Sequence, residues 1–284
     1  MQSKTINIKG ELLDLSHPMV MGILNITPDS FYEGSRKQTE EQIILRVNEI
    51  LSQGGKIIDI GGQSTSPSST MLTSEEEMER LGFALKVINR EFPDAILSVD
   101  TFYSNTARRC VEEYGVAIIN DISGGEIDKN MFETVADLKV PYILMHMRGT
   151  PQTMQKQTKY DNLIQDIFYY FSQKIAELHL LGVNDVIIDP GFGFSKTVKQ
   201  NYELMASLKG FDIFDLPLLV GISRKSMIYN LLGINPTESL NGTTVLNTFA
   251  IQNGANILRV HDVREAVESI QIIETLDNLS KGLC

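Results

Sequence analysis

Residues 186–194 read VIIDPGFGF, an apolar run that stops on an aspartate and a glycine-rich turn. A short apolar run of this composition is typical of a strand that is buried on both faces of a parallel sheet. Stretches with helical pattern separate most such runs, which predicts parallel strands joined by helical crossovers. Seven further runs stop on a polar or glycine-bearing cluster: residues 20–25 (VMGILN), 57–62 (IIDIGG), 96–100 (ILSVD), 116–121 (VAIIND), 142–146 (YILMH), 218–225 (LLVGISRK) and 257–262 (ILRVHD).

Eight such units in 284 residues predict an α/β fold, a (β/α)8 or TIM barrel that residues 1–284 form as a single domain. Residues 5–16 (TINIKGELLDLS) predict a short N-terminal β-hairpin around Lys9-Gly10, which we expect to plug the bottom of the barrel. In such barrels the reacting groups lie on the loops that leave the carboxyl ends of the strands. The polar clusters are therefore expected to meet on one face.

Helical patterns fill the intervals between the runs. Ser74 with Glu77, and Asp262 with Glu265, match the pattern of a capping box. Two connections, residues 25–40 and 63–73, are long, and we predict that both are mobile lids over the top of the barrel. We predict helices over residues 40–53, 74–90, 104–114, 161–181, 201–208, 226–232 and 242–252, and a last helix from residue 262.

Composition excludes several classes of function. The formal net charge is −11 and no basic stripe is visible, which argues against a nucleic-acid partner but leaves an anionic small substrate open. The two cysteines, Cys110 and Cys284, form neither a disulfide framework nor a zinc spacing. Neither a signal peptide nor an apolar run of membrane-spanning length is present, so we expect a cytoplasmic protein that does not bind membranes.

Two clusters of basic residues end the last two predicted strands. Ser223-Arg224-Lys225-Ser226 precedes a helix, where barrels often bind phosphate; the equally weighted alternative is an N-cap by Ser223 with solvated Arg224 and Lys225. Strand alternation sends Arg259 and His261 in the same direction, so they predict a cationic pair that suits a diphosphate. The alternative for Arg259 is an ion pair with a carboxylate of the barrel.

Polar residues at the other strand ends suggest a second type of ligand. Any one of them could merely cap a helix or brace a loop, but five on one rim offer donors and acceptors for a flat, nitrogen-rich heterocycle and an oxygen ligand for Mg²⁺. The aromatic rings of the DPGFGF turn could stack on such a ring or cover the barrel. His146 is more often a structural histidine than a catalyst, and no nucleophile–histidine pair or zinc-ligand spacing is present. The five rim residues are Asn25, Asp59, Asp100, Asn120 and Asp189.

Taken in order, these clusters resemble the dihydropteroate synthase family over nearly the whole chain. The motifs are MGILNITPDSF (21–31), IIDIGGQST, LSVDT, IINDISGG, LMHM, DPGFGF, VGISRKS and LRVHD (258–262). The resemblance implies a transferase of folate biosynthesis that condenses 6-hydroxymethyl-7,8-dihydropterin diphosphate with 4-aminobenzoate and releases diphosphate. It also implies Mg²⁺ as cofactor, sulfonamides as inhibitors, and a homodimer.

The resemblance assigns roles to individual residues. It implies Lys225, Arg259, His261 and Asn25 as the catalytic group, with Mg²⁺ on Asn25. The diphosphate is expected on Asn25, Thr65, Arg259 and His261. The pterin is expected on Asp100, Asn120, Asp189, Lys225 and Met145. The 4-aminobenzoate and the lids are expected to involve Phe31, Thr65, Ser66, Pro67, Phe194 and Ser226.

The second long connection departs from the family pattern of Glu followed by Ser-Thr-Arg-Pro-Gly. Here it reads Gln63-Ser64-Thr65-Ser66-Pro67-Ser68, so Ser66 replaces an arginine expected near the diphosphate. Loss of one charge-assisted contact costs roughly 1.5–3 kcal/mol. We hypothesise that Arg36 and Lys37 substitute for this arginine. Unchanged turnover and diphosphate affinity in both Arg36→Ala and Lys37→Ala would refute the hypothesis. A Ser66→Arg, Ser68→Gly variant would show whether the change alters sulfonamide inhibition, in a direction that the sequence leaves open.

Two other functions remain as alternatives. A methyltetrahydrofolate methyltransferase shares the pterin-facing Asp and Asn residues but has no use for the SRKS and RVHD cations. An inactive or regulatory pterin-binding paralogue fits only the altered second connection. For the dimer, the face of helix 242–252 that carries Val245, Leu246, Phe249 and Ala250 is the candidate, unless it packs on the barrel.

Overall fold

The eight apolar runs form eight parallel strands of one sheet in the computed structural model, which describes residues 4–26, 36–64 and 69–281. The strands follow one another around the sheet in the order β8-β7-β6-β5-β4-β3-β10-β9. They are β3 (Met19–Asn25), β4 (Ile57–Gly61), β5 (Ile96–Asp100), β6 (Ile118–Asp121), β7 (Tyr142–Met145), β8 (Val186–Asp189), β9 (Leu219–Val220) and β10 (Ile257–Val260).

A single bridge brings the two edge strands of this sheet together. Ile188 of β8 pairs with Leu218, and the backbone N–H of Ile188 donates to the carbonyl of Pro217 at 2.9 Å. The sheet is therefore a nearly closed barrel, which confirms the predicted (β/α)8 architecture.

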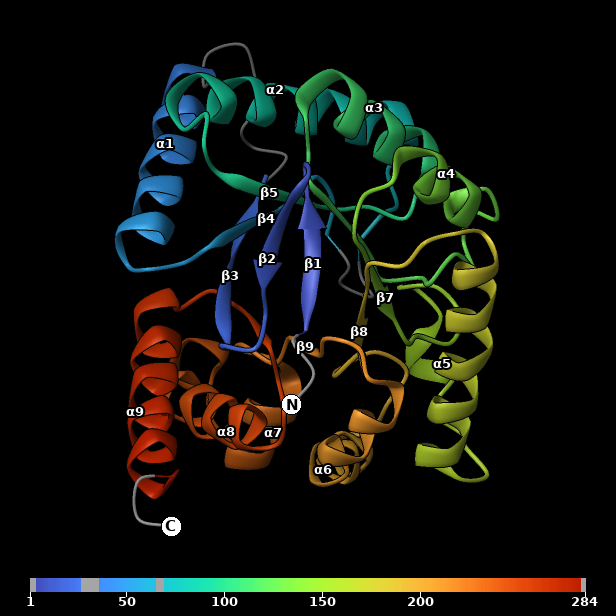
Figure 1. Ribbon diagram of the computed structural model, residues 1–284, viewed down its shortest axis with the longest axis vertical. Coiled ribbons are helices and arrows are strands. Elements are labelled where there is room, and N and C mark those ends of the chain that lie inside the picture. Colours follow the sequence, from blue (N-terminus) through green and yellow to red (C-terminus); the bar gives the residue numbers. More distant parts are fainter. Residues whose placement is uncertain (1–3, 27–35, 65–68, 282–284) are drawn as a thin grey trace.

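Helices surround the barrel in a ring (Figure 1). Those expected from the sequence are present with end shifts of a few residues, and α4, which was not predicted, covers the barrel beside α3. The helices are α1 (Arg36–Ser52), α2 (Ser74–Glu91), α3 (Ser104–Tyr114), α4 (Met131–Leu138), α5 (Leu163–Leu180), α6 (Val198–Ala206), α7 (Ser226–Leu232), α8 (Leu240–Gln252) and α9 (Val263–Lys281), with 3-10 turns at Met154–Lys156, Leu208–Phe214 and Pro236–Glu238.

Two details of helix capping differ from the sequence-based prediction. The capping box of α2 is formed by Thr73 rather than Ser74: the Thr73 hydroxyl accepts from the Glu76 N–H at 3.2 Å, and the Glu76 carboxylate accepts from the Thr73 N–H at 2.8 Å. Ser223 does not cap α7, whose N-cap position is Lys225. The Ser223 hydroxyl instead accepts from the backbone N–H of His261 at 3.2 Å, so it ties β10 to the segment before α7.

The N-terminal hairpin closes the amino-terminal end of the barrel, as predicted. Its strands β1 (Thr5–Ile8) and β2 (Glu11–Asp14) meet at a turn in which Lys9 and Gly10 both have positive φ, 54° and 94°. In Figure 1 the hairpin lies across the centre of the ring of helices. Three of its apolar side chains, Ile6, Ile8 and Leu15, join one buried cluster with residues of the barrel. The barrel residues of this cluster are Met21, Ile57, Ala117, Ile118, Ile143, Ile187, Leu219 and Ile257.

Alternation along the strands places polar groups inside the upper barrel. In β4, Ile58 and Ile60 belong to the core between sheet and helices, whereas Ile57 joins the plug cluster. Asp59 therefore points into the barrel one step above the apolar plug, and Gly61 follows at the mouth. This register creates a polar layer on top of a sealed apolar floor.

Parts of the two predicted lids are not among the residues that the structure describes. Residues 27–35 and 65–68, which contain most of the first predicted lid and the centre of the second, are not among the described residues. Arg36 and Lys37 begin α1. Across the described parts of the chain, no helix combines the length and the apolar character needed to cross a membrane.

Candidate active site

A cavity of about 870 Å³ opens at the carboxyl end of the barrel, and every barrel strand contributes to its lining. Eight contributions come from the strand ends, as the last or next-to-last residue of each strand or, for β9, the glycine directly after it; Ile23 of β3 lines the cavity as well. Convergence of this kind is what the barrel predicts for its reacting groups. The eight contributions are Asn25, Gly61, Asp100, Asn120, Met145, Asp189, Gly221 and Arg259.

The cavity gathers most of the predicted site residues. Ser226 begins α7 and is half-buried, but it is not among the described residues that line the cavity. Phe31, Thr65, Ser66 and Pro67 lie outside the described residues. Those brought together are Asn25, Asp100, Asn120, Met145, Asp189, Phe194, Lys225, Arg259 and His261.

Arg259 is held between two carboxylates at the centre of the cavity floor. Its Nε donates to Asp59 at 2.6 Å and its Nη2 donates to Asp100 at 2.8 Å. Asp59 is fully buried, and it also accepts hydrogen bonds from Ser98 at 2.6 Å and Asn120 at 3.0 Å. The ion pair that was the alternative for Arg259 is thus present, and Asp59 lies below the rim rather than on it.

The charges of this group follow from burial and mutual attraction. Burial alone would lower the pKa of Arg259, but Asp59 and Asp100 outweigh it and raise that pKa further above its ordinary value. Burial raises the pKa of Asp100, and the contact with Arg259 acts in the opposite direction. Arg259 is therefore a permanent cation whose position is fixed by Asp59 and Asp100.

His261 does not form the predicted cationic pair with Arg259. Burial, together with the nearby charges of Arg259 and Arg224, lowers the pKa of His261 to about 4. The imidazole is neutral at pH 7, because its pKa lies well below that value. His261 therefore faces the cavity as a hydrogen-bonding group, and Arg259 supplies the positive charge.

Lys225 lies across the turn that follows β8. Its Nζ donates to the carbonyl of Phe192 at 2.6 Å and sits 4.6 Å from the centre of the Phe194 ring. Burial lowers the pKa of Lys225 to about 8, although Asp189 opposes this shift. Burial raises the pKa of Asp189, which the charge of Lys225 counteracts. Lysine and aspartate thus face the same part of the cavity with opposed charges.

Glycine is required in the turn that carries these contacts. Gly191 has a φ of +72°, and a Cβ at this position would lie 2.0 Å from the carbonyl oxygen of His146. The N–H of Gly191 donates to Asp189 at 2.8 Å, which fixes that carboxylate at the end of its strand. The close approach of this turn to β7 therefore sets the position of Asp189 and Phe194.

A buried lysine that the sequence-based reasoning missed supports the same turn. Lys196 donates to Nδ1 of His146 at 3.0 Å and to the carbonyls of Gly191 and Phe194 at 2.9 and 3.1 Å. Burial lowers the pKa of Lys196 to about 7 and holds that of His146 well below its usual range. His146 is thus a buried structural residue, as expected. The signal for Lys196 was its place directly after GFGFS, but its side-chain partner His146 is distant in sequence.

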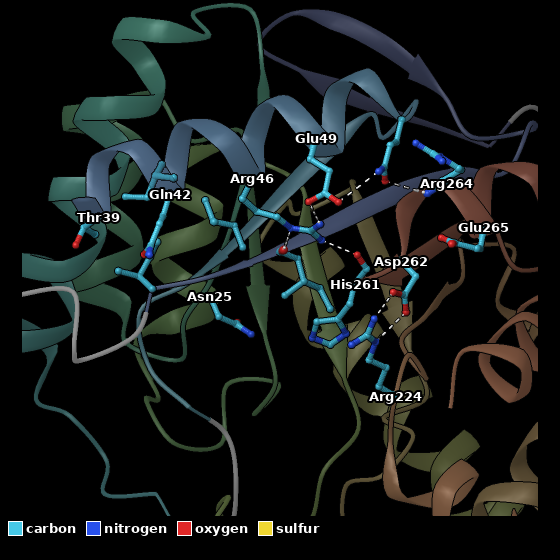
Figure 2. Close-up of a pocket in the computed structure, with 15 residues that line it drawn as sticks. Asn25, Thr39, Gln42, Arg46, Glu49, Arg224, His261, Asp262, Arg264 and Glu265 are labelled. Atoms are coloured by element: carbon cyan, nitrogen blue, oxygen red, sulfur yellow. Dashed lines mark hydrogen bonds and ion pairs between the residues drawn. The ribbon is translucent and has the colours of Figure 1, made fainter. Parts of the chain in front are cut away.

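A second cavity of about 560 Å³ adjoins the first and shares Asn25, Arg224 and His261 with it (Figure 2). Arg46 of α1 donates to the carbonyls of Ile23 at 3.3 Å and His261 at 2.6 Å, which holds the ends of β3 and β10 together. Arg224 forms a two-point ion pair with Asp262, with one contact of 2.9 Å. Sequence reasoning gave Arg46 no role, because only the fold places it against the two strand ends.

The donor set of the cavity restricts how a metal could bind. Within the described ranges, no three His, Cys, Asp or Glu side chains cluster in a way that could hold a metal ion. Asn25 presents an exposed amide at the end of β3 (Figure 2). A single amide oxygen fits Mg²⁺ that keeps most of its ligands as water and substrate phosphate oxygens.

The chain is similar to known proteins over almost its full length. The family described as pterin binding enzyme matches residues 21–261, which span the barrel from β3 to the end of β10. Dihydropteroate synthase of Escherichia coli (strain K12) is 41% identical over 268 residues, 94% of each chain. A Yersinia pestis dihydropteroate synthase in complex with a sulfonamide drug superposes with a TM-score of 0.89 at 39% identity, over 96% of this chain and 99% of that one. The Xanthomonas albilineans enzyme with 4-aminobenzoic acid gives 0.86 at 33%, over 97% and 99%.

Proposed function

Because this chain belongs to the dihydropteroate synthases of the pterin-binding enzyme family, we propose that the cavity at the carboxyl end of its barrel holds both substrates of that reaction. The chain is a transferase that joins 6-hydroxymethyl-7,8-dihydropterin diphosphate to 4-aminobenzoate, in folate synthesis. The products are 7,8-dihydropteroate and diphosphate.

The pterin ring binds against the acidic and amide side chains of β5, β6 and β8. The ring nitrogens and the exocyclic amino group meet acceptors on Asp100, Asn120 and Asp189. The amide of Asn120 can also donate. Asp100 and Asn120 are held through Arg259 and Asp59, so they enter the complex already oriented. Met145 supplies an apolar contact at the end of β7.

The diphosphate binds on the side of Asn25, Arg259 and His261. Arg259 stabilises the negative charge that develops as the carbon–oxygen bond to the pterin methylene breaks. His261, which is neutral in the free protein, contributes a hydrogen bond. Mg²⁺, held by Asn25 and by phosphate oxygens, would add positive charge at the same place. Thr65 is assigned here from the family resemblance alone.

The 4-aminobenzoate binds beside Lys225 and Phe194. Its amine attacks the methylene carbon, the diphosphate leaves with the bonding electron pair, and the amine then loses one proton. Lys225 contacts the pterin carbonyl, and Phe194 stacks on the aromatic ring. The family resemblance assigns four further residues to the 4-aminobenzoate site: Ser226 at the start of α7, Phe31, Ser66 and Pro67. The mechanism requires no covalent enzyme intermediate.

One observation supports this assignment most strongly: a single cavity contains the pterin-facing groups of three strands and the arginine of a fourth. The experiment is the formation of dihydropteroate by the purified chain from the two substrates with Mg²⁺. We expect turnover. Binding of the pterin substrate without turnover would instead identify an inactive paralogue. The methyltransferase alternative is not favoured, because the cavity combines these groups with Lys225 and Arg259.

We extend the proposal to inhibitors and location. Sulfonamides resemble 4-aminobenzoate and would compete for the space beside Phe194 and Lys225; the Yersinia pestis relative was solved with such a drug. We propose that the protein works in the cytoplasm, as expected from its sequence.

Neutral His261 predicts how the rate depends on pH. We expect His261→Gln to lower kcat/KM about three- to tenfold, the value of one hydrogen bond. Since kcat/KM reports the free enzyme, in which the pKa of His261 is about 4, the wild-type to variant ratio should stay constant between about pH 5.5 and 8. A ratio that grows as the pH falls through about 6.5 would show instead that His261 acts as a cation.

We also propose a homodimer through α8. Ala250 of the predicted face is buried and Leu246 packs on the core, but Val245 and Phe249 are 58% and 40% exposed. We expect Phe249→Asp to convert a dimer into a monomer in size-exclusion chromatography with light scattering. Leu180→Asp on α5, at an equally apolar exposed site, is the control and should remain a dimer. A monomeric wild-type protein would contradict the proposal.

A further inference from the structure

Five residues form a closed ring of hydrogen bonds where the connection between β4 and α2 begins and ends. The Gln63 amide donates through Nε2 to Glu77 at 2.6 Å, and Thr101 donates to the other oxygen of Glu77, also at 2.6 Å. The Tyr103 N–H donates to the Thr101 hydroxyl at 3.2 Å, and the Tyr103 hydroxyl donates to the carbonyl of Leu72 at 2.6 Å. The Leu72 N–H closes the ring on Oε1 of Gln63 at 3.4 Å.

This ring joins three parts of the cavity wall. Gln63 and Leu72 line the cavity themselves, at the two ends of the connection. Thr101 directly follows Asp100, which lines the cavity and accepts from Arg259. Glu77 belongs to α2 and lies at the centre of the ring with no exposed surface. A change in the ring would therefore move residues that line the cavity, Asp100 among them.

The ring depends on the chemical identity of residue 63. Glu77 only accepts hydrogen bonds here, so its neighbour at 2.6 Å must donate. An amide has both an N–H for Glu77 and an oxygen for the Leu72 N–H, and it needs no proton from solvent to do so. The family pattern has glutamate at this position, and a glutamate in place of Gln63 would lie against the carboxyl group of Glu77 and would need a shared proton.

We propose that Gln63 is a positioning residue of this enzyme: its amide fastens both ends of the β4–α2 connection to Glu77 and, through Thr101, to the segment that carries Asp100. The titratable groups that face Glu77 are Arg80 on the same helix, Asp100 and Tyr103 at the end of β5, and Cys110 on α3. Burial raises the pKa of Glu77, and the hydrogen bonds from Thr101 and Gln63 oppose that shift.

The test is the pH profile of kcat/KM for dihydropteroate formation in Gln63→Glu. Glu77 is buried and residue 63 is half-buried, so two carboxyl groups in contact here would share a proton, and the second ionisation would move to higher pH. At about pH 6 the pair keeps its proton and the variant should stay within about threefold of wild type. At about pH 8.5 the proton is lost, the carboxylates repel, and we expect a rate at least about tenfold lower than wild type.

The double variant Gln63→Glu, Glu77→Gln is the matched control, because it exchanges the acid and the amide. The amide at position 77 can donate to the new carboxylate and still accept from Thr101, so we expect the wild-type profile to return. A Gln63→Glu profile parallel to wild type at every pH would overturn the proposal, as would a stable exchanged variant that keeps the alkaline loss. The profile of Gln63→Glu alone decides the question even if the exchanged variant fails to fold. Dihydropteroate formation by the wild-type protein tests the proposed function separately.

Discussion

Replacing Arg259 with methionine is expected to lower kcat/KM by a factor on the order of 10²–10³, the usual cost of removing a donor to developing negative charge. Arg259 is a permanent cation of the cavity, held there by Asp59 and Asp100. His261 is neutral at pH 7, and the other two lining arginines are engaged elsewhere, Arg224 by Asp262 and Arg80 by the carbonyl of Gly62. The loss should appear mainly in kcat, because the interaction strengthens as the diphosphate leaves. Steady-state rates of dihydropteroate formation measure it.

The same substitution should destabilise the fold, which requires a control. Asp59 is fully buried and pairs with Arg259 at 2.6 Å, so removal of the arginine leaves a buried charge without its partner, at a cost of about 3–5 kcal/mol. In the double variant Arg259→Met, Asp59→Asn, the buried charge of Asp59 is absent. We therefore expect much of the stability to return in thermal unfolding. The rate should remain low. Recovery of the rate together with the stability would mean that Arg259 acts only as a structural partner of Asp59.

Replacing Lys225 with methionine is the second substitution with a large expected effect. The aliphatic stem of Lys225 packs on the turn at Gly193, where a Cβ would lie 3.1 Å from Cδ of the lysine. Methionine keeps this packing and removes the ammonium, which also leaves buried Asp189 without its nearby cation. A hydrogen bond to a charged group contributes about 1.5–3 kcal/mol, so kcat/KM at pH 7 should fall roughly 10- to 150-fold.

The pH dependence separates the charge of Lys225 from its shape. The pKa of Lys225 is lowered to about 8, so the wild-type lysine loses its proton as the pH rises through that value. The ratio of wild-type to Lys225→Met rates should therefore decrease above about pH 8, where both proteins lack the cation. A ratio that stays constant between about pH 7 and 9.5 would contradict a role for the ammonium group.

The strands were predictable because each is a local apolar pattern, and the helices because most carry a local end signal. The exceptions show what such signals miss. Helix α4 has no side-chain cap on its N-cap residue Asn130, and it ends at Lys139 with a φ of 54°, where glycine is the usual signal. Strand β9 is two residues long, because the chain turns after Gly221, with Lys225 N–H bonded to the carbonyl of Ile222.

The site was predictable as far as it depends on strand ends. Polar residues that stop an apolar run reach the cavity because the barrel brings all carboxyl ends together. Asp59 was misplaced because it precedes the end of β4 by two residues, so it lies one layer deeper. Its partner Arg259 is distant in sequence, and the pattern alone does not show which carboxylate an arginine selects.

Properties that depend on contacts between distant segments could not be predicted. The charge of His261 is set by burial and by arginines before α7 and on β10. Lys196 acquires its place from His146, directly after β7, and Glu77 from Gln63 and Thr101, which follow β4 and β5. These residues have no local pattern, because their partners are chosen by the fold.

The most direct measurement of the central claim is a crystal structure of the protein with the dihydropterin diphosphate substrate and Mg²⁺. We expect the pterin ring within hydrogen-bonding distance of Asp100, Asn120 and Asp189, with the diphosphate against Asn25, Arg259 and His261. A diphosphate bound only in the adjoining cavity beside Arg46, with the ring outside the barrel mouth, would contradict it.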